Sequence, residues 1–145
     1  MTSGDSAKKT FIEGFNCAQA VLTAYSGRYG MHDFAAKKIS CAFGAGCARQ
    51  SLTCGAVTGA LMVVGLKYGK TEANDDESKE LTYKKVNEFV NKFKTKYSSV
   101  NCYELLGCDL ATEEGRAFYS ENDLFHNECI KYINDTCEIL DQMGL

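Results

Sequence analysis

Apolar side chains recur along most of this chain at intervals of three and four residues, the spacing of one face of an α-helix. The pattern predicts a first helix that starts near Ser6 and runs toward Tyr25, with a break before Asn16 and a fresh start at Cys17. No stretch alternates apolar and polar residues as a half-buried strand does. The sequence therefore predicts an all-α protein, with further helices over residues 33–43, 54–68, 77–97, 102–106 and 122–143.

The stretch from Cys54 to Tyr68 is apolar on nearly every side. A helix with this pattern is expected at the centre of a core rather than on its surface. Gly55 and Gly59 lie four residues apart, so they share one helix face, which allows a neighbouring helix to approach closely. We expect a single-domain helical bundle over residues 1–145, built around this apolar, glycine-containing central helix. Its glycine face is also compatible with a homodimer.

Composition and charge narrow the functional classes. Hydrophobic residues make up 45% of the 145 residues, as in folded proteins, and the net charge of −3 argues against a nucleic-acid partner. Lys and Arg outnumber Asp and Glu by eight to three in residues 1–70, whereas acidic residues outnumber basic ones by ten to two in residues 101–145. We interpret this acidic C-terminal third as a solvated face, with a docking surface as the alternative.

The chain is expected to be cytoplasmic, without membrane insertion. Its longest apolar run, residues 56–66, is shorter than the about 20 residues that a membrane span needs. The first nine residues are polar and lack the apolar segment of a signal peptide. Cytoplasmic thiols stay reduced, so the many cysteines need an explanation other than a disulfide framework.

The eight cysteines are Cys17, Cys41, Cys47, Cys54, Cys102, Cys108, Cys129 and Cys137. No two of them are separated by two residues, which excludes a thioredoxin-type pair, a zinc knuckle and a bacterial ferredoxin motif. Cys137 and Cys41 are predicted to belong to the core. Cys47 and Cys108 each follow a glycine and are predicted to lie exposed on loops, as candidate resolving or accessory thiols.

Four cysteines follow residues that favour the start of a helix. The pairs are Asn16–Cys17, Thr53–Cys54, Asn101–Cys102 and, two residues apart, Asn127 and Cys129. Asn and Thr are helix N-cap residues, and a thiol at a helix N-terminus has its pKa lowered by free N–H groups and the helix dipole. Thiolates bind metals and iron–sulfur clusters, so these four could form one tetra-cysteinyl site if the fold gathers them. The alternative is that all four are ordinary buried cysteines.

Three further features are weaker candidates. The stretch Gly44-Ala45-Gly46 is expected to form a tight turn rather than an anion cradle, because no Lys-Ser/Thr follows it as in a P-loop. Arg49 is expected in solvent, with anion binding as the alternative. His126 lies three residues before Cys129 and shares its helix face, but a role beside that thiol is the less favoured interpretation.

Read in order, the cysteine motifs resemble the redox-active proteins of the C_GCAxxG_C_C family. The resemblance rests on residues 16–21 (NCAQAV), 54–66 (CGAVTGALMVVGL), 102–107 (CYELLG) and Cys129, and it covers almost the whole chain. It implies one domain over residues 1–145 with redox activity, and its four signature cysteines fall on Cys17, Cys54, Cys102 and Cys129. The chain departs from the family at Ile130, where relatives often carry a proline.

Three hypotheses for the function follow. The first is an electron carrier that holds one iron–sulfur cluster on Cys17, Cys54, Cys102 and Cys129 and works with a redox partner protein. The second is a thiol–disulfide oxidoreductase, in which Cys54 attacks and Cys102 or Cys47 resolves. The third is a non-catalytic module with a four-cysteine zinc site, or without a cofactor, that docks a partner through its acidic C-terminal third. A redox protein or electron carrier is favoured over a classical enzyme.

Overall fold

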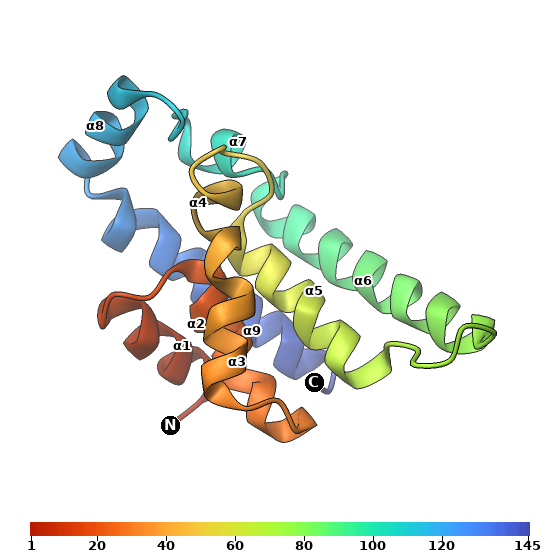
Figure 1. The fold of residues 1–145 in the computed structure, drawn as a ribbon. Coiled ribbons are helices and arrows are strands. Elements are labelled where there is room, and N and C mark those ends of the chain that lie inside the picture. The colour runs from red at the N-terminus through yellow and green to blue at the C-terminus, as the bar shows by residue number, and fades with distance from the viewer.

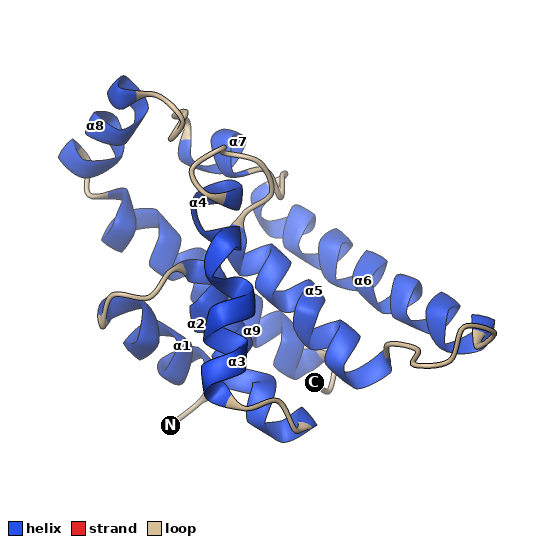
Figure 2. Cartoon of the chain, viewed as in Figure 1, coloured by secondary structure: helices blue, strands red, loops and turns tan.

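The computed structural model describes residues 1–145, and its regular structure is helical, with no strand (Figure 2). The all-α prediction is therefore confirmed. None of the helices combines the length and the apolar character needed to cross a membrane. The labelled helices are α1 Ser3–Ile12, α2 Cys17–Ser26, α3 Asp33–Ser40, α4 Gly44–Cys47, α5 Gly55–Tyr68, α6 Asp76–Tyr97, α7 Cys102–Leu106, α8 Glu113–Glu121 and α9 Ile130–Gln142.

The predicted break before Cys17 is present and separates α1 from α2. Gly14 has a φ of 116°, which ends α1 and turns the chain. The Asn16 side chain then accepts the N–H of Gln19, and the Gln19 side chain accepts the N–H of Asn16, forming a capping box. Helix α1 begins earlier than predicted because Thr2 forms a second capping box. The start of α2 is thus fixed by the local sequence.

Helix α5 occupies the centre of the core, as its all-round apolar sequence predicted. It packs against α2, α6 and α9 (Figure 1). A Cβ atom built on Gly59 would lie 3.0 Å from the Ala18 carbonyl oxygen and 3.0 Å from Cβ of Val21, both on α2. The glycine face therefore lets α2 approach α5 closely, which brings the first residues of these two helices together.

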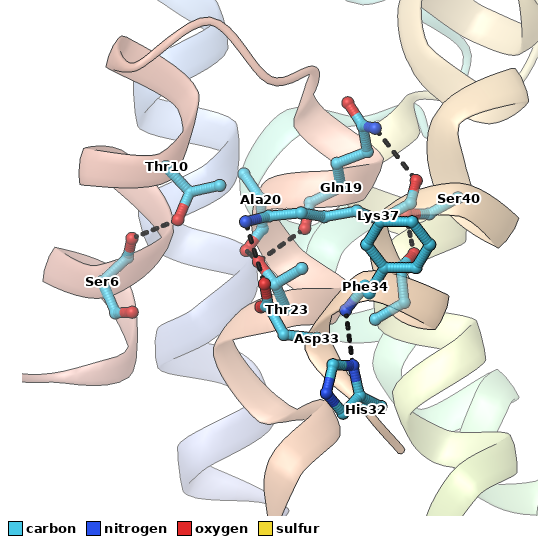
Figure 3. Close-up of polar contacts among 11 residues, drawn as sticks. Ser6, Thr10, Gln19, Ala20, Thr23, His32, Asp33, Phe34, Lys37 and Ser40 are labelled. Atoms are coloured by element: carbon cyan, nitrogen blue, oxygen red, sulfur yellow. Dashed lines mark hydrogen bonds and ion pairs between the residues drawn. The ribbon is translucent and has the colours of Figure 1, made fainter.

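Helix α3 packs against α2 (Figure 3). The Gln19 amide donates to the Lys37 carbonyl oxygen at 2.9 Å, and the His32 ring accepts the N–H of Phe34 at the start of the helix. Only Ala36 and Ser40 of α3 are buried. The prediction that Cys41 belongs to the core is wrong, because Cys41 follows α3 on its exposed side.

The C-terminal helix is irregular in its first turns. Residues 125–129 form a π-helical turn, and regular α-helix runs from Ile130 to Gln142. Ile133, Cys137 and Leu140 are fully buried against the rest of the bundle, so the core assignment of Cys137 is confirmed. The π-helical turn matters because it sets the direction in which the last predicted site cysteine, Cys129, faces.

Candidate functional site

A pocket of about 320 Å³ lies at the end of the bundle where α2, α5 and α7 begin. Its lining includes all four cysteines singled out by the capping pattern: Cys17, Cys54, Cys102 and Cys129. They come from four separate parts of the chain: the starts of α2, α5 and α7, and the π-helical turn that leads into α9. The fold thus gathers the four predicted residues, and Figure 1 shows α4 and α7 lying together at this end of α5.

The four thiols lie within electrostatic reach of one another. Beyond the effect of burial, negative charge on Cys17 raises the pKa of Cys54, Cys102 and Cys129. No three His, Cys, Asp or Glu side chains are arranged closely enough to hold a single metal ion. Zinc bonds to sulfur are about 2.3 Å long, so a zinc site needs its sulfurs almost in contact.

The capping argument is correct for two of the four cysteines. Cys17 and Cys102 are the first residues of α2 and α7, and Asn16 and Asn101 cap these helices through their side chains. Cys54 is itself the N-cap residue of α5, so the prediction that Thr53 caps that helix is wrong.

The predicted helix start at Cys129 is also wrong. The backbone before Cys129 is already helical, and the N–H of Ile130 bonds to the carbonyl oxygen of Phe125 in the π-helical turn. A thiol inside a continuous helix has no free N–H groups beside it, so Cys129 gains nothing from a helix terminus.

The predicted lowering of the thiol pKa values is contradicted as well. Burial in this apolar pocket raises the pKa of all four thiols, to about 12 for Cys102 and Cys129. The cost of removing a thiolate from water exceeds the benefit of the nearby backbone dipoles. The thiols are therefore protonated at neutral pH unless a cationic group binds to them.

Each of the four sulfurs nevertheless has a hydrogen-bond donor that favours its thiolate form. These donors lower the pKa by less than burial raises it. They are the N–H groups of Ala45, Ala18 and Gly55 for Cys17, those of Ala56 and Val57 for Cys54, the Ser51 hydroxyl for Cys102, and the Tyr119 hydroxyl, 3.5 Å from the sulfur, for Cys129. Donors of this kind stabilise sulfur ligands of metal centres.

Gly55 is required for the position of Cys17. A Cβ atom at residue 55 would lie 2.3 Å from the Cys17 sulfur and 3.0 Å from the Phe43 carbonyl oxygen. Any other side chain at this position would push the sulfur out of its place. The Cys54-Gly55 pair of the motif therefore supplies one thiol and makes room for another.

The predicted tight turn is present, but it is left-handed. Residues 45–49 all have φ angles between 55° and 70°, although only one of the five, Gly46, is a glycine. For other residues this conformation costs roughly 1–2 kcal/mol each. A Cβ on Gly46 would lie 2.5 Å from the Leu52 nitrogen, so the turn packs tightly on the chain that follows it. The turn brings the Ala45 N–H to Cys17 and leaves Arg49 exposed at the pocket.

The sequence analysis missed three pocket residues: Arg116, Tyr119 and Tyr132. Arg116 and Tyr119 lie three residues apart on α8, the spacing of one helix face, and that was the only available signal. The Tyr132 hydroxyl lies 2.8 Å from Glu128 Oε2 and 3.0 Å from the Leu105 carbonyl oxygen.

Other candidate residues lie outside the pocket. The His126 ring is 59% exposed and pairs with Asp123 at 2.9 Å. Cys108 is buried, contrary to the prediction that it is exposed, and it neighbours Cys102 closely enough to raise the pKa of that thiol. Cys47 lies half-buried within the left-handed turn.

Comparison with known proteins gives one match. The family model described as "Putative redox-active protein (C_GCAxxG_C_C)" matches residues 15–143. The matched segment contains all four cysteines that line the pocket. No curated protein and no solved structure matches the chain.

Proposed function

Because this chain belongs to the C_GCAxxG_C_C family, whose description is redox activity, we propose that it carries electrons through an iron–sulfur cluster held by Cys17, Cys54, Cys102 and Cys129. The observation that supports this most is the convergence of four thiols from four chain segments on one pocket. Four cysteine thiolates are the usual ligand set of such clusters. We expect the protein to work in the cytoplasm with a redox partner protein.

Two observations favour a cluster over the alternatives. The pocket volume of about 320 Å³ has room for a group of several atoms. A thiol–disulfide enzyme needs an attacking thiolate at neutral pH. Burial raises the pKa of Cys54 and Cys102, the two candidates for that reaction, so their thiolates are scarce at neutral pH.

The chain's own residues have definable roles around such a group. When bound, an iron–sulfur cluster accepts and releases single electrons. The four thiols must lose their protons on binding, so loading is favoured by higher pH. The N–H groups directed at Cys17 and the Tyr119 hydroxyl stabilise negative charge on sulfur, which would raise the reduction potential of a bound cluster. Most of the pocket lining is apolar and includes Phe11.

The test is the iron and acid-labile sulfide content of protein purified without oxygen, together with its visible spectrum. We expect iron and sulfide in equal amounts, lost in Cys54→Ser and retained in Cys41→Ser. Cys41 is an exposed free cysteine outside the pocket, so it is a matched control for the chemical change.

Other results would replace this proposal. Protein that lacks both iron and sulfide rules out the cluster. Stoichiometric zinc in colourless protein would indicate the four-cysteine zinc module instead. A reversible change in an even number of free thiols near the cytosolic potential would indicate thiol–disulfide chemistry.

A further inference from the structure

Two arginine side chains, Arg49 and Arg116, line the cysteine pocket, and no acidic residue lines it with them. Neither arginine takes part in any ion pair of the structure. Both residues are exposed, so they lie where the pocket opens to solvent. The pocket therefore has thiols and apolar walls, and two positive charges without counterions at its opening.

The two arginines are carried by chain segments that are tied to each other. Arg116 Nη1 donates to the Leu110 carbonyl oxygen at 3.0 Å, and the Leu110 N–H donates to the Ser51 hydroxyl at 2.8 Å. Ser51 lies two residues after Arg49 and is itself held by a bond from its N–H to the Ala45 carbonyl oxygen. These bonds tie the left-handed turn to the start of α8, and both arginines line the same pocket.

We propose that Arg49 and Arg116 bind a small oxyanion at the opening of the cysteine pocket. The ligand carries a carboxylate, phosphate or sulfate group. A guanidinium group binds such groups through two parallel hydrogen bonds, and only one Arg116 nitrogen is used within the protein.

The strained conformation of Arg49 is consistent with this role. Its φ of 70° is a left-handed value that arginine rarely adopts, and strained residues concentrate at binding sites. One part of this proposal rests on the proposed function: if a cluster is bound, the oxyanion lies beside it and is a small-molecule reactant or regulator of the redox group. Anion binding itself does not require that a cluster is present.

The experiment is calorimetric titration of the full chain, purified without oxygen, with sodium phosphate, sodium sulfate and sodium acetate at constant ionic strength. We expect saturable binding of at least one anion to one site, and the three probes show which oxyanion group is preferred. Arg49→Gln and Arg116→Gln should each weaken binding at least about tenfold. Lys84→Gln, which removes an exposed positive charge from α6 outside the pocket, should change the dissociation constant less than about twofold.

The proposal is wrong if none of the three anions binds saturably, or if Lys84→Gln weakens binding as much as the arginine variants do. Arg49→Gln decides the outcome if Arg116→Gln fails to fold, since Arg116 loses its hydrogen bond to the Leu110 carbonyl oxygen and Arg49 has no ion pair to lose. Iron and sulfide are measured on the same preparations. Iron and sulfide without anion binding would refute the anion site and support the cluster. Anion binding without iron would support the anion site and refute the cluster.

Discussion

Replacing Gly55 with alanine tests the packing that holds Cys17 in the pocket. The added Cβ would lie 2.3 Å from the Cys17 sulfur, 3.0 Å from the Phe43 carbonyl oxygen and 3.2 Å from the Ala18 nitrogen. Ordinary contacts of this kind begin near 3.4 Å, so the sulfur must move by about 1 Å and two backbone atoms must also shift. Nothing in the backbone of α5 itself opposes alanine at this position, because its φ is not left-handed.

Two opposing effects set the expected magnitude. Overpacking of a well-filled site costs about 1–3 kcal/mol. Exchanging glycine for alanine within a helix gains up to about 1 kcal/mol. Gly65→Ala on the same helix measures the helix-propensity gain alone, because a Cβ at residue 65 meets nothing within 4 Å and causes no overpacking. We therefore expect Gly55→Ala to be about 1–3 kcal/mol less stable to unfolding than Gly65→Ala.

The assay is urea denaturation of the metal-free, reduced protein, with Gly59→Ala as a third variant. Gly59→Ala crowds α2 through Ala18 and Val21 but leaves the Cys17 sulfur untouched. It should lower stability without lowering the iron and sulfide content, whereas Gly55→Ala should lower both. If Gly55→Ala proves as stable as Gly65→Ala, the close contact between residue 55 and the thiol is not a feature of the protein.

Three further predictions concern the surroundings of the pocket. Tyr119→Phe removes the hydroxyl donor to Cys129 and should lower the reduction potential of the cluster by about 20–60 mV, measured by redox titration. Tyr103→Phe, on the exposed face of α7, should leave the potential unchanged. Burial raises the pKa of Cys129 from its ordinary value of 9.0 to about 12, and this stabilises the folded metal-free protein below about pH 9. The stabilisation should be lost as the pH rises from 9 to 12. Urea denaturation of Cys129→Ala should show a weaker loss of stability over the same pH range. Gly115→Ala would place a Cβ 1.7 Å from the Asp109 carbonyl oxygen and should cost about 3 kcal/mol or more of unfolding free energy, measured by urea denaturation.

Much of the secondary structure could be predicted because its signals are local. Three such signals depend only on residues close together in the sequence: the capping box of Asn16 and Gln19, the glycine at residue 107, and the apolar run of α5. Errors arose where contacts distant in sequence decide the outcome. Cys41 was placed in the core because Ile39 and Phe43 lie beside it in the sequence, but Ile39 and Cys41 are both exposed.

The candidate site divides in the same way. The sequence singled out Cys17, Cys54, Cys102 and Cys129 through their neighbours, and the structure places all four at one pocket. The sequence also suggested that the pKa values of these thiols are lowered, because a sequence shows where a helix begins but does not show that the thiol there is buried. Desolvation depends on every atom that surrounds the sulfur, and most of these belong to other segments.

The sequence alone thus determined most of the helices and their order and singled out four thiols, since periodicity, caps and glycines are properties of neighbouring residues. Only the tertiary structure decided that these thiols share a pocket and that burial raises their pKa. It also decided that a left-handed turn and α8 bring Arg49 and Arg116 to the opening of that pocket. Those features depend on how distant segments pack, and the packing follows from the total buried surface rather than from any one motif.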